Sequence, residues 1–384
     1  MKIIYQMKKI RILRIIHTLN PELGGPSNAI IHNSIALKKN GFSVDILTSD
    51  KSNFNYNKNI KVYNIGPGIG NYGINFKIVF WLLKNKKKYD IFIIHELWRF
   101  YNLLARIMLK NYYVFTHGQL DPFFKKNLFK RIKKQIYWLL FEKKNLLKSK
   151  SILLTTDEER KLLYKTFVNT DGINKNVVGY GIFKSNFSKI KAKTSFFKRF
   201  PYLKKKNFLI FLGRFHEKKG CDILIYSVKK VVKKNIKINI LMVGPNNELK
   251  KKLQNLCKSL NIEKNFFWSD MLVGKEKFGA IYASKGMVLA SHGENFGLSI
   301  AESLSCSTPV ITTNKVNIFK HILKSKAGLI SKNNVNDFSK NLEKFCKFDK
   351  RKLSQLSSNS KLCFEKNFDF SKINNGLAKL LYKK

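Results

Sequence analysis

Short apolar runs alternate with amphipathic segments along most of this chain. An apolar run at 9–18 precedes apolar residues at helical spacing from 29 to 37, and a second run follows at 42–48. The same order recurs in the second half, where runs at 207–212 and 287–290 each lead into a polar loop and a further amphipathic segment. Runs of this length indicate buried strands. Their alternation with helices predicts an α/β fold with parallel sheets.

The remaining pattern extends this alternation to both ends of the chain. Further strands are predicted at 113–116, 151–156, 177–181 and 238–243, and further helices at 249–260, 274–283 and 335–345. A length of 384 residues allows two domains. We expect an N-terminal domain at 1–185, completed by a C-terminal helix at 366–384, and a second domain at 186–365. The basic, Phe-rich segment from 183 to 206 is interpreted as their connection.

The segment 286–311 carries the most specific chemistry. It predicts a strand at 287–290, a loop, a helix that begins near Phe296 and ends before Pro309, and a further strand. A helix start suits a phosphate, and Glu294 and Glu302 stand before and inside the helix. One carboxylate could reach the sugar end of a ligand and the other its ribose. From spacing alone, an ordinary strand–helix unit with a capping and a solvated glutamate explains the segment better.

The residue identities add a family resemblance. Glu294 to Glu302, followed by Thr-Pro-Val-Ile at 308–311, resembles the Glu-x7-Glu signature of retaining glycosyltransferases of family 4, which have the GT-B fold of two Rossmann-like domains facing across a cleft. The resemblance implies that Glu294 contacts hydroxyls of the donor sugar and that Glu302 binds the ribose. It also implies donor contacts for the residues between them, Asn295, Phe296, Gly297 and Leu298. Ser307 stands where the family usually has Gly, which makes the end of the helix less certain.

A second loop supports the same interpretation. Gly213-Arg214 follows a buried strand, and Lys219-Gly220 comes five residues later. Two cations at that spacing, with a Gly to turn the chain, can clamp a phosphate, although an exposed basic loop would look the same. The resemblance implies that Arg214 and Lys219 grip the donor diphosphate.

Three further places are candidates for the donor site. The double-Gly turn at Gly24 and Gly25 follows the first strand, at the edge where open α/β sheets bind ligands. Met271 and Leu272 resemble the family segment that meets the nucleotide base, although Asp270 replaces a usual Gly. His117 opens a His-Gly-x-Leu-Asp-Pro loop that resembles one bacterial subgroup building surface polysaccharides. A His after a strand is more often structural, but the resemblance implies a place beside the reacting carbon of the donor.

Two apparent motifs are set aside. The Gly-rich stretch 66–73 contains G-x-G-x-x-G, but it does not open the first strand–helix unit, and we expect a flexible loop. His95-Glu96 resembles a zinc motif whose second His is replaced by Arg99.

The chain is strongly basic. Its 74 Lys and Arg against 24 Asp and Glu give a net charge of +50, which favours phosphates, anionic lipid or nucleic acid as partners. Biased composition explains most of this excess. Residues 125–150 hold ten Lys or Arg and one acid, Glu142, among apolar residues at helical spacing. This predicts a basic amphipathic helix that either lies on anionic lipid or packs on its own sheet with a solvated Lys face.

Two sequence features suggest a compartment. There is no signal-peptide pattern and no run of about 20 apolar residues. The five cysteines lack paired spacing and are interpreted as reduced thiols of a cytoplasmic protein. The basic segment also allows a peripheral place on the inner face of the cytoplasmic membrane.

The hypothesis is transfer of a sugar from a nucleotide-sugar donor to a hydroxyl of a glycan or lipid-linked saccharide, and the resemblance implies retention of anomeric configuration. No Asp-x-Asp pair occurs, so no metal or other cofactor is expected. One alternative is a GT-B sugar-nucleotide epimerase or hydrolase. Another is a basic protein that binds lipid surfaces or nucleic acid. Nucleic acid is not expected, because neither a helix-turn-helix nor a single-strand-binding pattern is present.

Overall fold

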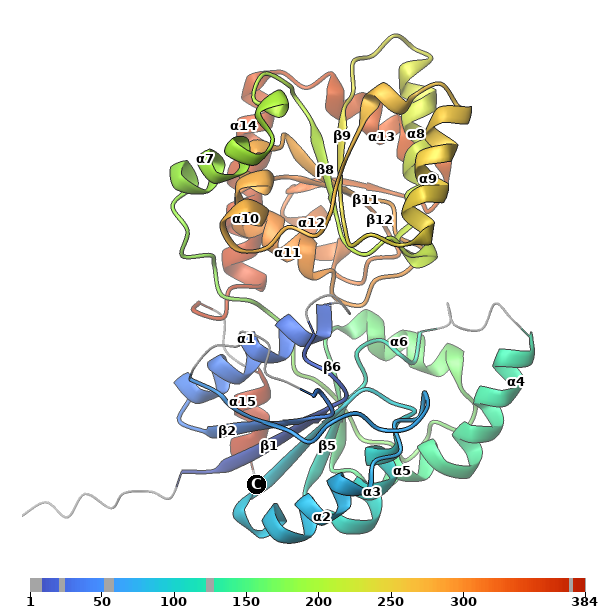
Figure 1. The fold of residues 1–384 in the computed structure, drawn as a ribbon, viewed down its shortest axis with the longest axis vertical. Coiled ribbons are helices and arrows are strands. Elements are labelled where there is room, and N and C mark those ends of the chain that lie inside the picture. Colours follow the sequence, from blue (N-terminus) through green and yellow to red (C-terminus); the bar gives the residue numbers. More distant parts are fainter. Residues whose placement is uncertain (1–8, 21–24, 52–58, 122–127, 373–375, 384) are drawn as a thin grey trace, which may run out of the picture. The chain divides into compact units, whose positions relative to one another are not determined.

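The chain forms two units, each built on one parallel sheet (Figure 1). The computed structural model describes residues 9–20, 25–51, 59–121, 128–372 and 376–383. Contacts group Met1–Tyr180 with Asn374–Lys384 as the first unit, and Gly181–Ile373 as the second. The predicted α/β fold with two Rossmann-like units is confirmed.

In the described part of the first unit, the sheet has seven strands in the order β3-β2-β1-β4-β5-β6-β7, and all neighbours are parallel. The strands are β1 (Arg11–Ile16), β2 (Ser43–Thr48), β3 (Lys61–Asn64), β4 (Ile91–His95), β5 (Tyr112–Phe115), β6 (Ser151–Leu154) and β7 (Lys175–Val177). The helices are α1 (Gly25–Lys39), α2 (Phe76–Asn85), α3 (Phe100–Met108), α4 (Leu128–Tyr137), α5 (Lys143–Lys148), α6 (Asp157–Thr166) and α15 (Gly376–Tyr382).

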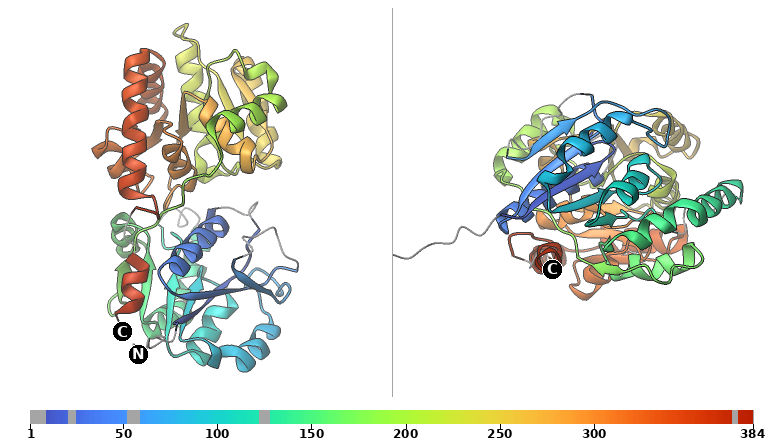
Figure 2. Two further views of the ribbon diagram at one scale, coloured as in Figure 1. Left: turned by 90° about the vertical axis from the view of Figure 1, so that its left-hand side faces the viewer. Right: turned by 90° about the horizontal axis from the view of Figure 1, so that it is seen from below.

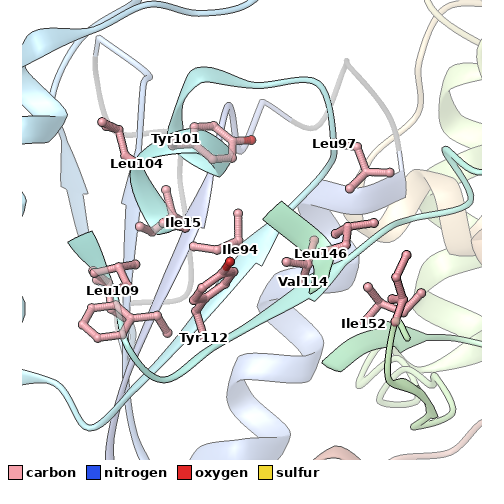
Figure 3. Packing of buried hydrophobic residues seen from close by; sticks show 14 of the residues in the cluster. Ile15, Ile94, Leu97, Tyr101, Leu104, Leu109, Tyr112, Val114, Leu146 and Ile152 are labelled. Atoms are coloured by element: carbon pink, nitrogen blue, oxygen red, sulfur yellow. The ribbon is translucent and has the colours of Figure 1, made fainter. Parts of the chain in front are cut away.

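The core of the first unit lies between this sheet and the helices on one of its faces. Residues of β1, β4 and β5 pack there against α2, α3, α5 and α6. Figure 3 shows Ile15 and Ile94 of neighbouring strands beside Tyr101 and Leu104 of α3. A smaller cluster on Ile30 of α1 covers the other face. Strands buried on both faces explain why the apolar runs are continuous rather than alternating.

The final helix, α15, belongs to the first unit, as Figure 2 shows in red. Tyr382 donates from its hydroxyl to the carbonyl of Asn40 at 2.5 Å, and its ring lies 4.4 Å from the ring of Phe42. The predicted return of the C-terminal helix is therefore confirmed. The preceding helix, α14 (Lys350–Asn367), stays with the second unit, so the return starts at Asn374, compared with 366 in the prediction.

The second unit has a sheet of six strands among the described residues, in the order β10-β9-β8-β11-β12-β13, again parallel. The strands are β8 (Leu209–Leu212), β9 (Ile240–Val243), β10 (Phe266–Ser269), β11 (Gly286–Leu289), β12 (Val310–Thr313) and β13 (Gly328–Ser331). The remaining helices are α7 (Lys189–Arg199), α8 (Cys221–Val232), α9 (Glu248–Ser259), α10 (Gly274–Ala283), α11 (Leu298–Ser305), α12 (Phe319–Lys324) and α13 (Val335–Cys346).

The segment 183–206 is not a simple connection, so that interpretation was wrong. It contains α7, which packs on α10 and buries Ala192 and Phe196. A side chain added at Gly279 of α10 would lie 2.1 Å from the carbonyl oxygen of Ala192, which shows how closely the two helices approach. Basic composition concealed the apolar stripe that anchors α7 to the second unit.

Three smaller predictions also need correction. The strand expected at 177–181 is β7, which ends at Val177, because Gly179 takes a left-handed backbone. The Gly-rich stretch 66–73 is an ordered turn closed by hydrogen bonds between Ile69 and Ile74. The helix expected at 125–150 is divided by a π-helical turn at Trp138–Glu142, with 122–127 outside the described residues.

This π-helical turn points two large side chains inward. Trp138 is fully buried, and Glu142 accepts hydrogen bonds from the backbone N–H of Trp98 at 3.3 Å and from Nδ2 of Asn102 at 3.0 Å. Burial raises the pKa of the Glu142 carboxyl to about 8. The one acid of the segment therefore anchors it to the unit, and does not balance the surrounding lysines at the surface.

Ser307 closes α11 in the left-handed conformation that the family's usual Gly would favour. Its φ is 59°, its N–H donates to the carbonyl of Leu304 at 2.9 Å, and the next N–H, of Thr308, donates to Ser303 at 3.0 Å. Its own carbonyl accepts a hydrogen bond from Ser357 of α14 at 2.6 Å. The helix end is therefore well formed, at the cost of strain in a residue with a Cβ.

We expect Ser307→Gly to stabilise the protein by about 0.5–1 kcal/mol, because Gly removes the left-handed strain but adds freedom to the unfolded chain. The matched control is Ser354→Gly, in the exposed middle of α14, which is expected to destabilise by about 0.5 kcal/mol. Denaturant unfolding measures both. Destabilisation by Ser307→Gly would show that the backbone there is not strained.

Candidate active site

Two loops of the second unit meet at the carboxyl ends of neighbouring strands. β8 and β11 are adjacent and parallel, so loop 213–220 and loop 290–297 leave the same edge of the sheet. The N–H of His292 donates to the carbonyl of Lys218 at 2.9 Å. Gly220, at a φ of 63°, lies so close that an added Cβ would be 2.0 Å from the carbonyl oxygen of Ala290. A residue with a side chain at this position would force the two loops apart.

The contact of these loops brings Lys219 and Glu294 together. The ammonium of Lys219 forms an ion pair and hydrogen bond with the Glu294 carboxylate, and each side chain is 20% exposed. Burial would raise the pKa of Glu294, but Lys219, Lys218 and Arg214 together lower it below its ordinary value. Three of the predicted site residues therefore share one electrostatic environment.

The backbone of Glu294 is fixed by the loop that follows β12. Its N–H donates to the carbonyl of Lys315 at 3.0 Å, and its carbonyl accepts from the N–H of Asn317 at 2.9 Å. Asn295 is held by the same loop, through a 3.3 Å hydrogen bond from Nδ2 of Asn317 to its side-chain oxygen. The carboxylate of Glu294 is thus presented from a rigid support.

The helix α11 starts two residues later than predicted, at Leu298. Gly297 precedes it with a φ of 72° and has no side chain to cap the helix. Phe296 is buried, and its ring lies 5.6 Å from the ring of Phe368. A helix start without a side-chain cap leaves backbone N–H groups for an external acceptor, and an anion suits that position.

Glu302 lies inside α11 and is 7% exposed. Its carboxylate accepts a hydrogen bond from the ammonium of Lys277, on α10, at 2.7 Å. The sequence analysis did not select Lys277. A glutamate among the apolar and small residues of α11 was the available signal, since a buried carboxylate requires a partner.

The predicted base-contacting residues, Met271 and Leu272, follow β10 at the same edge of the sheet, two strands from β8. Leu272 is buried and Met271 is half-buried. Asp270, in place of the family's Gly, forms an ion pair with Lys250 at 2.7 Å. This pair lowers the pKa of Asp270.

In the first unit, His117 follows β5 and belongs to a row of buried polar groups. Nε of Arg14 donates to Nε2 of His95 at 3.0 Å, and Nδ1 of His95 lies 2.8 Å from Nε2 of His117. Burial, followed by the charge of Arg14, lowers the pKa of His117 to about 3, and the pKa of His95 also lies well below its ordinary value. The sequence analysis missed Arg14 and set His95 aside with the zinc motif.

Two other predictions concern the donor loop and metal binding. Gly24 lies outside the described residues, and Gly25 is the first residue of α1. Across the described ranges, His, Cys, Asp and Glu side chains form no group of three suited to a metal ion. The described helices include none with the length and apolar character needed to cross a membrane.

Comparisons of the sequence with known proteins find matches to part of this chain. Residues 193–362 match the family model "Glycosyl transferases group 1". Two uncharacterized glycosyltransferases of Methanocaldococcus jannaschii are each 29% identical to this chain, over 179 and 166 residues. The matches cover 45% and 42% of this chain, and they span 47% and 39% of those relatives, so the chain matches under half of their length.

Solved structures match nearly the whole fold. Sucrose-phosphate synthase from Thermosynechococcus elongatus gives a TM-score of 0.76 at 16% identity, covering 98% of both chains. HepE from Anabaena, in complex with UDP and glucose, gives 0.76 at 14% identity, covering 98% of this chain and all of HepE. WaaG, a glycosyltransferase involved in lipopolysaccharide biosynthesis, gives 0.74 at 14% identity, covering 97% of this chain and all of WaaG.

These likenesses establish the GT-B fold. The family match covers the strands, the two loops and both glutamates described above. Residues 193–362 therefore match the glycosyl transferases group 1 family model, within a chain that has the GT-B fold.

Proposed function

We propose that this protein transfers a sugar from a nucleoside diphosphate sugar to a hydroxyl group of a glycan or lipid-linked saccharide, with retention of anomeric configuration. The ion pair of Lys219 with Glu294, beside Arg214, is the observation that carries the proposal. At this edge of the sheet, the carboxylate can bind the sugar hydroxyls of a sugar diphosphate, and the two cations can bind its phosphates. The family match and the Glu-x7-Glu resemblance support the same function.

The chemical step breaks the bond between the anomeric carbon and the diphosphate and forms a bond to the acceptor oxygen, whose proton passes to an oxygen of the departing diphosphate. Negative charge develops on the departing diphosphate. Arg214, Lys219 and the N–H groups at the start of α11 are proposed to stabilise it, since prepositioned donors are effective where charge appears. Because Arg214 and Lys219 are cationic, we propose that no metal ion is required.

The remaining site residues receive proposed roles in donor binding. Glu294 would bind hydroxyls of the sugar, and Glu302, oriented by Lys277, the ribose. Met271 and Leu272 would meet the base, and His117 would act beside the anomeric carbon. Gly24 and Gly25 would line the phosphate side. UDP is the first donor nucleotide to test, because it is bound in the HepE structure.

Lys219→Met is expected to lower the rate of sugar transfer about 100- to 1,000-fold, the usual effect of removing one prepositioned donor to a developing charge. Glu294→Gln is expected to have a comparable effect. The assay supplies a panel of UDP-sugars in the presence of a chelator, with a lipid extract as acceptor. Binding of UDP, measured by the shift in melting temperature, is expected to weaken in Lys219→Met.

Lys218→Met is the matched control, because it removes a neighbouring cation and leaves the ion pair of Lys219 with Glu294 in place, and its loss of rate should stay within about tenfold. Full transfer by Lys219→Met would contradict the proposal. Donor turnover that needs no acceptor would instead identify a hydrolase or epimerase. Salt-sensitive binding of DNA without affinity for UDP would identify a basic nucleic-acid-binding protein.

We also propose that the acceptor lies at an anionic membrane surface and that the segment from α4 to α5 binds this surface. Four side chains at helical spacing, Ile132, Ile136, Leu139 and Leu140, are 43–54% exposed. Exposed lysines flank them, including Lys133, Lys144 and Lys148. An exposed apolar face bordered by cations suits the boundary of an anionic bilayer, because its apolar side chains can enter the lipid while the lysines contact the headgroups.

The chain is expected to sediment with vesicles that contain phosphatidylglycerol and to remain in solution with phosphatidylcholine vesicles. Ile136→Ser with Leu140→Ser should weaken this binding about tenfold or more, because each buried apolar side chain contributes about 1–2 kcal/mol. Leu362→Ser, at a similarly exposed position in α14, is the control and should bind as the wild type does. Equal binding of the double variant would contradict the proposed surface.

A further inference from the structure

Arg14, His95 and His117 form a chain of hydrogen bonds that fixes where each proton lies. A guanidinium can only donate, so Nε2 of His95 must accept from Nε of Arg14. His95 must then carry its proton on Nδ1, which faces Nε2 of His117. Nε2 of His117 must therefore accept, and the proton of His117 lies on Nδ1.

A proton added to either imidazole would break this chain. Protonated His95 would place an N–H against the N–H of Arg14, and protonated His117 would place an N–H against that of His95. Both rings are therefore neutral. The lowered pKa of each histidine has the same direction and is caused by burial and by the charge of Arg14.

Arg14 itself is held in this role by its surroundings. It is fully buried, and its Nη1 donates to Oδ1 of Asn33 at 2.7 Å and to the hydroxyl of Ser34 at 3.0 Å, both in α1. Burial lowers its pKa to about 10, so it stays charged at neutral pH. Among the described residues no carboxylate forms an ion pair with it, and its Nη2 has no hydrogen-bond partner. These contacts hold Arg14 so that its Nε–H points at Nε2 of His95.

The backbone around His117 is equally constrained. His117 has a φ of 48°, an uncommon conformation for a residue with a side chain. The carboxylate of Glu159, on α6, accepts from the N–H of Gly118 at 2.9 Å and from the hydroxyl of Thr116 at 2.7 Å. Other ionisable groups nearby are Tyr180, which interacts with Arg14, and Glu96 at the end of β4. The loop thus holds the ring of His117 against His95.

We propose that Arg14 and His95 are positioning residues that lock His117 as a neutral hydrogen-bond donor through Nδ1. The ring is half-buried, and Nδ1 bonds to no described residue, so it remains for a ligand. The inference rests on the proposed function for the identity of that ligand, which would be an electron-rich oxygen of the donor sugar or diphosphate. It excludes His117 as the general base for the acceptor hydroxyl, because neither nitrogen can take up a proton.

The direct test is long-range ¹⁵N–¹H correlation NMR of the full chain labelled at its seven histidines. His95 and His117, assigned by single substitution, are expected in the Nδ1–H form without change from pH 5.5 to 8.5. An Nε2–H form of His117, or titration near the ordinary value of about 6.5, would overturn the proposal. No substrate is needed, so this result is independent of the proposed transfer reaction.

Two variants of nearly equal shape separate positioning from packing. His95→Asn can still donate to Nε2 of His117, whereas His95→Leu cannot. His117 is expected to keep the single Nδ1–H form in His95→Asn and to show a mixture of Nδ1–H and Nε2–H forms in His95→Leu, because only the Asn side chain still donates to Nε2. The kcat of transfer should fall further in His95→Leu than in His95→Asn, because only part of His117 then presents an N–H on Nδ1. Identical behaviour of the two folded variants would show that His95 only fills space.

Discussion

The ion pair between Lys219 and Glu294 is the contact around which the candidate site of the second unit is built. It joins loops from two neighbouring strands, and it is possible only because Gly220 lets the first loop touch the second. Separating a partly buried pair would leave each charge without compensation, which is costly. The pair therefore holds the two loops together and gives each charge a partner.

The same logic of charge compensation recurs elsewhere in the molecule. Glu302 is kept buried by Lys277, and Glu142 is kept buried mainly as the neutral acid. Arg14 differs, because its charge is met by neutral groups, and its hydrogen bond to His95 fixes the tautomers of two neutral imidazoles. Each of these buried groups thus has polar partners within its own unit.

The sequence was sufficient for the fold and for finding the two loops that meet in the second unit, and the reasons are local. Continuous apolar runs could only be buried parallel strands, and the two signature loops follow such strands directly. Lys277 and His95 could not be found that way. Lys277 contacts Glu302, 25 positions away, and His95 contacts His117, 22 positions away, because separate elements pack together. The helix α7 was missed because its lysines concealed a narrow apolar stripe. Ser307 shows the reverse case, in which tertiary contacts hold a backbone that the residue itself disfavours.

A crystal structure of the chain with UDP would test the central claim most directly. The account predicts the two phosphates within hydrogen-bond distance of Arg214, Lys219 and the first N–H groups of α11, with the ribose hydroxyls at Glu302. Lys219 should then have exchanged at least part of its contact with Glu294 for a phosphate oxygen. UDP bound away from these side chains, with the ion pair intact and the loops unchanged, would contradict the account.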